Sequence, residues 1–481
     1  MESLGTRRVK PVTLVDRNPE FFRLGFMGVV WTVVAAVTSG LLFQAAIAPV
    51  SVAALGWVCF VPTLFVCRGR GFAVGFGTGL AAVLMAAHLA RCGLWCQPSL
   101  LDTDPGWIYT GFALFGLPVG VVHGLVGEDR TPKLWTPFLV AVWAVILESL
   151  LLVILPSHLA LTQQQNWIML RVASATGVWG VSFLVWSANL WLCSLIATQQ
   201  WRWASALVAG LGAMSLIDLY RTPPAHDGLK VAALQVPIDD VENLVSMTRA
   251  MKDKGVDIVV WPEAAGLSFT AVEGTEPLVT LSRSLGSTLF TTTYDDQLRP
   301  LPHNAMAVWG RGTESAKYHK RKLFGGERAT HRAGEVPVAV WSDDTVFGLN
   351  ICFDTCFPHI IRETALVGDV GVVLLPTLDP GSPFGVCQAV HAAYTTFRAA
   401  ESGVAIVRAE ALAYSHIVDN QGQIVAQAGS GERAALSATV SPVRNWTLYR
   451  QFGDWFLGLC FLVVVTAKIL TSRASKGQRQ G

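Results

Sequence analysis

Residues 257–263 read Asp-Ile-Val-Val-Trp-Pro-Glu, a short apolar run that ends at a proline and a carboxylate. Residues 372–375, Val-Val-Leu-Leu, form a second run of this kind. Neither run alternates between apolar and polar residues, which is typical of strands buried on both faces of a sheet. Between residues 229 and 408 such runs are separated by polar, helix-compatible stretches. The pattern predicts a layered α/β domain whose chemistry lies just beyond the strand ends.

The individual elements of this domain follow from the same pattern. The expected strands include residues 230–235, 257–261, 288–292, 304–309, 346–351, 371–375 and 404–408. The expected helices cover residues 238–254, 272–286, 357–367 and 386–402.

The rest of the chain is far more apolar than this domain. Hydrophobic residues make up 52% of the 481 residues and charged residues 15%, and the mean hydropathy is +0.44. A chain of this composition predicts an α-helical membrane bundle, because about 20 apolar residues cross a hydrocarbon core as a helix. The eight candidate spans are residues 26–43, 50–66, 72–91, 107–124, 137–155, 175–197, 203–219 and 455–471.

The distribution of Lys and Arg predicts the orientation, because cationic connections tend to stay in the cytoplasm. Cationic residues precede the first span, fall in every second connection and close the chain: Arg7, Arg8, Lys10, Arg17, Arg23, Arg68, Arg70, Arg130, Lys133, Arg202, Arg473, Lys476 and Arg479. The connections 44–49, 92–106 and 156–170 have none. We therefore expect a cytoplasmic N-terminus (1–25), a seven-span domain (26–219), an extracytoplasmic α/β domain (220–454), a last span (455–471) and a cytoplasmic tail (472–481).

Nucleic acid is not an expected partner of this chain. Its net charge is only +2 at pH 7, and it has no basic cluster interleaved with aromatic residues.

Three residues of catalytic type lie near expected strand ends or between apolar segments. Glu263 follows the 257–261 strand and could act as a general base, although a solvated acid capping a helix is the commoner role of such a residue. Lys320 lies in a cationic stretch and could stabilise an oxyanion, although a basic surface turn is the alternative. Cys352 ends an apolar strand, where an exposed thiol is a candidate nucleophile rather than a small buried hydrophobe.

The order of these three residues along the chain resembles one known superfamily. A Glu after a Trp-Pro strand end, a Tyr-x-Lys segment and an apolar strand ending in Cys resemble the nitrilase superfamily of carbon–nitrogen hydrolases, whose domain is an αββα sandwich. Within it, the chain resembles the apolipoprotein N-acyltransferases. Two further stretches carry that resemblance, residues 177–183 (Gly-Val-Trp-Gly-Val-Ser-Phe) with Asn189, and residues 447–449 with 453–455.

The resemblance implies an N-acyltransferase of bacterial inner membranes that needs no cofactor. Glu263 would be the base, Lys320 would hold the oxyanion, and Cys352 would attack a phospholipid acyl ester to give a thioester. Glu327 matches a further carboxylate that positions the lysine or the incoming amine. The acceptor would be the α-amine of the diacylglyceryl cysteine of an apolipoprotein, and the enzyme would be a monomer. Arg408 and Ser415 align with family positions near the site.

The chain departs from the family pattern at positions beside the site. Residues 323–327 read Leu-Phe-Gly-Gly-Glu, one residue shorter than usual and without a proline. Phe353 and Asp354 stand where Tyr-Glu is usual, and residues 377–384 replace an Asn-Asp-x-Trp-Phe segment. We expect substrate contacts at these places and nearby: Trp261, Phe353, Asp354 and Phe384.

Two other functions remain open at this point. A membrane-anchored amidase would use the same three residues but resolve the acyl-enzyme with water. A homologue without turnover would only bind lipids or lipoproteins. No metal site is expected, because the histidines lack ligand spacing. Cys352 and Cys356 are expected to stay unpaired, since a nucleophile must remain a thiol.

Overall fold

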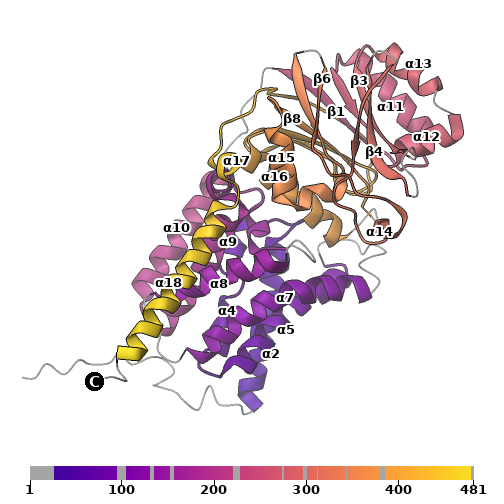
Figure 1. The fold of residues 1–481 in the computed structure, drawn as a ribbon. Coiled ribbons are helices and arrows are strands. Elements are labelled where there is room, and N and C mark those ends of the chain that lie inside the picture. The colour runs from indigo at the N-terminus through magenta and orange to yellow at the C-terminus, as the bar shows by residue number, and fades with distance from the viewer. Residues whose placement is uncertain are drawn as a thin grey trace, which may run out of the picture.

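The computed structural model describes residues 26–94, 105–129, 135–151, 157–219, 228–273, 276–295, 301–310, 313–342, 344–379 and 385–477. Residues 1–25, Arg130, Lys133, Arg479 and Phe384 lie outside the described residues. The described residues form an apolar helical part, which includes the long C-terminal helix, and an α/β part (Figure 1).

The helical part contains helices of the length and composition that a membrane requires. Four described helices are long and apolar enough to cross a membrane, over Met27–Ala46, Phe72–Arg91, Ile108–Glu128 and Trp167–Ala197. The helices of this part are α2 (Phe26–Ala46), α3 (Ala53–Gly56), α4 (Val61–Cys67), α5 (Phe72–Arg91), α7 (Pro105–Glu128), α8 (Thr136–Leu151), α9 (Trp167–Ala197), α10 (Trp201–Leu219) and α18 (Trp455–Gly477).

The second expected span, residues 50–66, is not one helix. It is split into the short helices α3 and α4, with Pro62 in the first turn of α4. Asn189 on α9 satisfies the backbone at the break, because its Oδ1 accepts from Phe60 N at 2.9 Å and its Nδ2 donates to Gly56 O at 2.9 Å. The expected single helix is therefore corrected to a broken segment whose backbone groups at the break are hydrogen-bonded from a neighbouring helix.

Helix α9 begins eight residues before the expected span 175–197, so part of the expected 156–170 connection is helical. Asn166 caps its first turn, its side chain accepting from Met169 N at 3.3 Å. The helix is kinked at Gly177, whose φ of 68° and ψ of −179° are accessible to glycine and costly for other residues. The ring of Tyr449, from the segment before α18, lies against this glycine.

The α/β part consists of two six-stranded sheets, in the orders β12-β1-β2-β3-β4-β5 and β11-β10-β9-β8-β7-β6. The strands of the first sheet are β1 (Leu229–Gln235), β2 (Ile258–Val260), β3 (Thr288–Asp295), β4 (His303–Gly310), β5 (Thr313–His319) and β12 (Ala434–Val440). Those of the second are β6 (Val338–Ser342), β7 (Thr345–Leu349), β8 (Val372–Thr377), β9 (Ala405–Glu410), β10 (His416–Val418) and β11 (Ile424–Gln427).

The two sheets pack face to face, and helices cover their outer faces (Figure 1). Val231, Phe290 and Phe347 belong to the apolar core between the sheets, where the last two rings lie 5.7 Å apart. The outer helices are α11 (Val241–Asp253), α12 (Ala265–Glu273) and α13 (Glu276–Leu285) on the first sheet, and α15 (Pro358–Leu366) and α16 (Val386–Ser402) on the second. This αββα sandwich beside a helical bundle confirms the predicted fold class.

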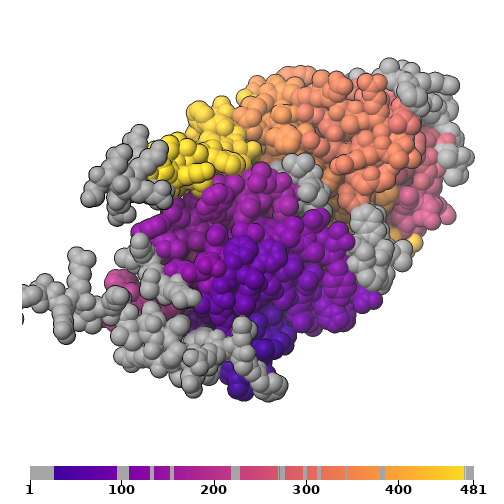
Figure 2. All heavy atoms as spheres, turned by 60° about the horizontal axis from the view of Figure 1, so that its bottom comes forward, coloured from indigo at the N-terminus to yellow at the C-terminus, as the bar shows by residue number. Residues whose placement is uncertain are grey.

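The sandwich rests on the helical part through α16. Phe397 and Ala400 of α16 share one apolar core with Trp179 and Val181 of α9. Figure 2 shows the purple helices packed against the orange sandwich, with the yellow C-terminal segment beside both. The sandwich and the helices therefore form one continuous body.

Candidate functional site

The three residues of catalytic type converge at one edge of the sandwich, each just after a strand. Glu263 follows β2, Lys320 follows β5 directly, and Cys352 begins the short 3-10 helix η2 (Cys352–Cys356) after β7. All three side chains are buried, with exposed fractions of 4%, 1% and 4%. The topology thus unites residues that are 89 positions apart along the chain.

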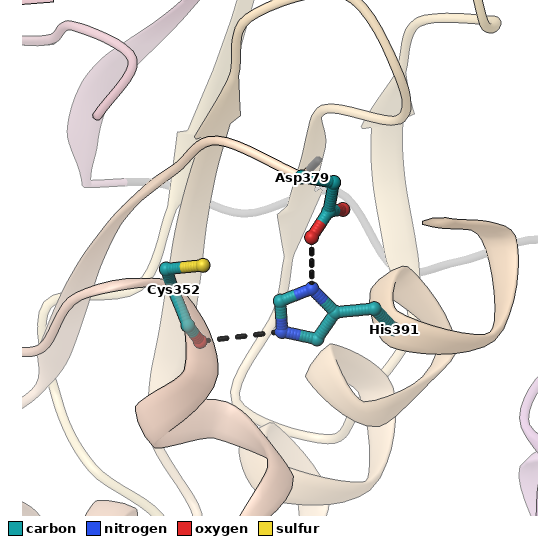
Figure 3. Close-up of side chains that lie close together, drawn as sticks. All are labelled: Cys352, Asp379 and His391. Atoms are coloured by element: carbon teal, nitrogen blue, oxygen red, sulfur yellow. Dashed lines mark hydrogen bonds and ion pairs between the residues drawn. The ribbon is translucent and has the colours of Figure 1, made fainter. Parts of the chain in front are cut away.

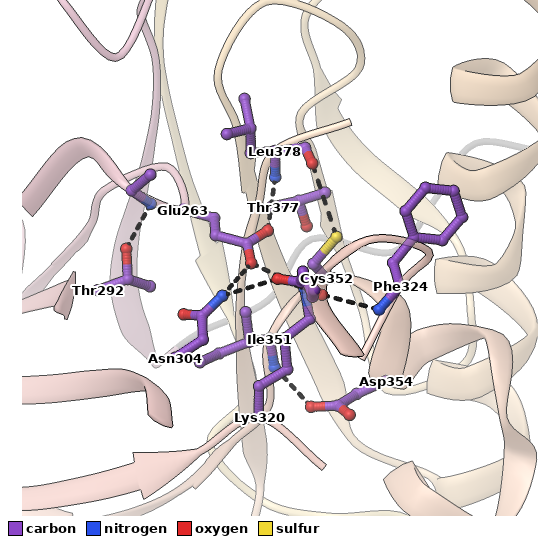
Figure 4. A network of polar contacts seen from close by, with 12 residues as sticks. Glu263, Thr292, Asn304, Lys320, Phe324, Ile351, Cys352, Asp354, Thr377 and Leu378 are labelled. Atoms are coloured by element: carbon purple, nitrogen blue, oxygen red, sulfur yellow. Dashed lines mark hydrogen bonds and ion pairs between the residues drawn. The ribbon is translucent and has the colours of Figure 1, made fainter. Parts of the chain in front are cut away.

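Lys320 is the centre of the polar network (Figure 4). Its Nζ lies 2.8 Å from Glu263 Oε1 and 2.9 Å from Glu327, so two carboxylates hold one ammonium. The amide of Asn304, on β4, donates to the same two carboxylates at 2.7 Å and 3.1 Å. The buried charges are therefore paired and hydrogen-bonded, as burial requires.

The carboxylate of Glu263 is fixed on its other side by the end of β8. Leu378 N donates to Glu263 Oε2 at 3.0 Å, and Glu263 N donates to Thr377 O at 3.3 Å. The next residue, Ala264, has a φ of 65° and donates its N–H to Thr292 Oγ1 at 2.6 Å. This turn reverses the chain after Pro262 and points the carboxylate toward Lys320 (Figure 4).

Cys352 also has a left-handed backbone, with a φ of 47°. Such a conformation is uncommon for a residue other than glycine and places the side chain at a sharp turn. Its Sγ lies 3.8 Å from Leu378 O, on the side of Glu263. Cys352 and Cys356 are both free thiols.

Burial and neighbouring charges shift the pKa values of Cys352, Lys320 and Glu327. Burial, followed by the facing Glu263, raises the pKa of the Cys352 thiol well above its usual value, and Lys320 opposes this rise. Burial alone would lower the pKa of Lys320, but Cys352, Glu263 and Glu327 outweigh it and raise that pKa. Burial would raise the pKa of Glu327, but the charge of Lys320 and the hydrogen bonds from Lys320, Phe324 N and Asn304 together lower it. The resting site therefore holds a protonated thiol beside a firmly charged ammonium.

A cavity of about 930 Å³ opens onto this network and extends into the helical part. The polar end contains Glu263, Lys320, Glu327 and Cys352, and the apolar end is lined by residues of α2 and α7. The apolar lining includes Phe43, Ile47, Ile108, Phe112 and Phe115. A cavity with one reactive polar end and one long apolar end suits a substrate that carries an acyl chain.

The expected substrate contacts fall into three groups. Phe353 lines the cavity, where its ring meets Phe324 at 5.1 Å. Trp261 and Asp354 do not appear among the described residues that line it. Phe384 lies outside the described residues.

Trp261 and Asp354 are buried parts of the framework, which corrects their expected contact with substrate. The indole of Trp261 donates to Thr248 Oγ1 at 2.9 Å, beneath helix α11. Asp354 is fully buried and accepts from Tyr318 OH at 2.6 Å, Ile351 N at 2.9 Å and Lys322 N at 2.8 Å. These bonds tie the turn of Cys352 to the segment that carries Lys320.

Sequence reasoning missed Asn304 and His391, both of which line the cavity. Cys352, Asp379 and His391 bring a thiol, a carboxylate and an imidazole within 4.8 Å of one another (Figure 3), a donor set that metals use. Both Asp379 oxygens are already engaged, however, Oδ1 by His391 Nδ1 at 2.5 Å and Oδ2 by Arg408 Nη2 at 2.8 Å. Arg408 already supplies a positive charge to the Asp379 carboxylate. The three residues therefore fit a hydrogen-bonded network better than a metal site.

Comparison with known proteins matches both parts of the chain to described families. Residues 39–191 match the apolipoprotein N-acyltransferase N-terminal domain, and residues 230–447 match the carbon-nitrogen hydrolase domain. A solved structure of an amidase from Nesterenkonia, of the nitrilase superfamily, is 20% identical with a TM-score of 0.42, covering 50% of this chain and 98% of that chain.

Curated relatives match over most of their length. The apolipoprotein N-acyltransferase of Geobacter metallireducens is 25% identical, covering 88% of this chain and 92% of the relative. The apolipoprotein N-acyltransferase of Nostoc is 25% identical, covering 84% of this chain and 90% of the relative. That of Thermotoga maritima is 22% identical, covering 93% of this chain and 95% of the relative. With both domains present in the order that these relatives share, this chain belongs to the apolipoprotein N-acyltransferase family.

Proposed function

We propose that this protein transfers a fatty acyl group from a phospholipid to the N-terminal α-amine of a diacylglyceryl cysteine on an apolipoprotein. The observation that carries the proposal is the cavity that joins the Cys352 thiol to an apolar wall formed by α2 and α7. Both substrates hold their acyl chains in a bilayer, and each methylene moved into water would cost about 0.8 kcal/mol. A site that opens into the helical part receives them without that cost.

In the first half-reaction, Glu263 takes the proton of the Cys352 thiol as the sulfur attacks the ester carbonyl carbon. The carbonyl electrons move onto oxygen, and the Lys320 ammonium stabilises the resulting oxyanion. When the oxyanion collapses, the carbon–oxygen bond to glycerol breaks, and Glu263 returns the proton to the departing lysophospholipid. The acyl group remains on Cys352 as a thioester.

In the second half-reaction, the neutral α-amine of the acceptor attacks the thioester carbonyl. Glu263 takes the proton that the nitrogen loses, the carbon–sulfur bond breaks, and the thiolate recovers that proton. The products are an N-acyl amide and the free thiol. Glu327 is a second carboxylate on Lys320, at 2.9 Å beside Glu263, and so helps to keep the ammonium in place in both steps.

The nitrilase-type amidase would share these steps but use water as the acceptor. The apolar end of the cavity favours a lipidic donor, because a small amide would leave those aromatic walls without a partner. A homologue without turnover is disfavoured by the paired Lys320 and Glu263, since an unused buried ion pair is a costly feature to retain.

We further propose a multi-pass protein of the bacterial cytoplasmic membrane, active as a monomer and without a nucleic-acid partner. The N-terminus (1–25) and tail (472–481) would be cytoplasmic, and residues 220–454 would face the periplasmic side. The described cationic residues Arg68, Arg70 and Arg202 lie at helix ends, which supports this orientation.

The test is to incubate the purified protein in detergent with phospholipid labelled in its acyl chain. We expect a label on Cys352 that hydroxylamine removes and that a diacylglyceryl lipopeptide converts into an N-acylated product. Cys352→Ala must abolish the label, whereas Cys387→Ala, in the same cavity, must keep it. Release of free fatty acid without transfer to the lipopeptide would support the amidase, and absence of any label on native protein would overturn the proposal.

A further inference from the structure

His391 lies beside the nucleophile but contacts its backbone rather than its sulfur (Figure 3). Its Nε2 lies 3.3 Å from Cys352 O, the carbonyl of the residue with the left-handed backbone. Thr355 Oγ1 donates to the same carbonyl at 2.6 Å and lies 3.3 Å from His391 Nε2. Two side chains therefore converge on one carbonyl oxygen, which has two lone pairs to accept them.

The neighbours of the two ring nitrogens of His391 indicate the hydrogen bond that each nitrogen makes. Cys352 O can only accept, and the hydroxyl hydrogen of Thr355 is directed to that oxygen, so Nε2 faces acceptors and must carry a hydrogen. Nδ1 faces Asp379 Oδ1 at 2.5 Å and donates to it. Nε2 thus serves the Cys352 carbonyl, while Nδ1 faces the Asp379 carboxylate and lies 3.4 Å from Arg408 Nη2.

Asp379 is itself held by groups from β9. Arg408 Nη2 donates to Asp379 Oδ2 at 2.8 Å, and Asp379 N donates to Glu410 Oε1 at 3.0 Å. Arg408 is fully buried and its Nε donates to Tyr414 O at 3.1 Å. Although burial would raise it, His391 and Arg408 lower the pKa of Asp379, so the carboxylate stays charged.

We propose that His391 is a positioning residue, which holds the strained turn of Cys352 through its carbonyl and is itself oriented by Asp379 and Arg408. The chain Arg408–Asp379–His391–Cys352 then joins the nucleophile to the centre of the second sheet. It opposes relaxation of the left-handed backbone, which would turn the sulfur away from Glu263 and Lys320. For acyl transfer, the role rests on the proposed function.

The experiment compares His391→Leu, His391→Gln and the control His359→Gln, a half-buried histidine on α15 outside the cavity. Leu removes both hydrogen bonds, whereas the amide of Gln can still donate to the Cys352 carbonyl. We expect His391→Leu to lower kcat for acyl transfer by about 100-fold, the effect of a small misplacement of a reacting group. The kcat of His391→Gln should lie between those of His391→Leu and His359→Gln. Both His391 variants should have the same KM for phospholipid as His359→Gln.

A second readout does not depend on the identity of the substrate. The rate at which iodoacetamide alkylates Cys352, followed by mass spectrometry of the full chain in detergent, should fall in His391→Leu and fall less in His391→Gln. If native protein transfers no acyl group, the proposed function fails but this readout still tests the positioning role. The role is overturned if His391→Leu, folded as judged by its unfolding midpoint, keeps the kcat or the alkylation rate of His359→Gln.

Discussion

The backbone N–H of Val178, at the kink of α9, donates a 2.7 Å hydrogen bond to the Glu401 carboxylate on α16. A residue of the apolar helical part is thereby bonded to a residue of the sandwich across 223 positions of sequence. Arg398 lies 2.9 Å from the same carboxylate, and both side chains are fully buried. The kink at Gly177 frees the amide that a straight helix would have bonded to its own backbone.

Removing this carboxylate should destabilise the whole protein. Glu401→Ala leaves Val178 N without its acceptor and the Arg398 guanidinium without its partner, at a cost of about 3–5 kcal/mol. The midpoint of thermal unfolding in detergent should fall well below that of Glu335→Ala, an exposed acid on the surface of the sandwich. Equal midpoints for the two variants would mean that the bond between the two parts contributes little.

The kink itself provides a second test. A Cβ at Gly177 would lie 2.5 Å from the Tyr449 ring, and its backbone angles cost another residue about 1–3 kcal/mol. Gly177→Ala should therefore lower the unfolding midpoint and displace Tyr449. Gly210→Ala is the matched control, because a Cβ there meets open space within α10, where Ala is the better helix former. A Gly177→Ala protein as stable as Gly210→Ala would argue against the kinked conformation.

Part of this arrangement could be predicted from the sequence. The unbroken apolar runs of β2 and β8 and the helices α15 and α16 lie where the sequence predicted them. Strands β5, β6, β10, β11 and β12 were not expected. β5 reads Thr-Glu-Ser-Ala-Lys-Tyr-His, an edge strand in which Ala316 and Tyr318 pack against the core between the sheets, and two such residues are too few to form a recognisable pattern. Lys320 could therefore be recognised from a motif, but not placed at a strand end.

The remaining parts of the site depend on contacts that no local pattern contains. Asn304 lies inside an expected strand, and nothing in that run distinguishes it from a polar edge residue. His391 is one polar residue on a helix, and its role arises only where α16 passes η2. The break at 57–60 depends on Asn189, which is 129 positions away. Such long-range hydrogen bonds explain why the reactive residues were easier to predict than the residues that hold them in place.

The raised pKa of Cys352 gives a prediction about pH. A thiol whose pKa lies above its usual value is mostly protonated at neutral pH, and only the thiolate is alkylated. Cys352 should therefore react with iodoacetamide more slowly than glutathione at pH 7, and its rate should still be rising above pH 9. Mass spectrometry of the labelled chain measures both.

The variant Lys320→Met tests whether Lys320 affects the pKa of Cys352. Lys320 lowers the pKa of Cys352, so its loss should reduce the thiolate fraction and slow alkylation further at each pH. Lys322→Met, two residues away and directed at the Phe357 ring 4.9 Å from its centroid, should leave the rate unchanged. Faster alkylation in Lys320→Met would contradict the assigned electrostatics.

The apolar end of the cavity predicts how the acyl chain is selected. Phe43 and Phe115 line the cavity, their rings 5.3 Å apart, and Phe60 stacks on Phe43 at 5.4 Å, so the first two rings form part of the cavity wall within the helical part. Phe115→Ala should open that end and shift preference toward donors with longer acyl chains. Each extra methylene buried contributes about 0.8 kcal/mol, or about fourfold in kcat/KM. Competition between labelled phospholipids of different chain length measures the shift. Leu117→Ala, exposed on the same helix, should keep the native preference, and an unchanged preference in Phe115→Ala would place the acyl chain elsewhere.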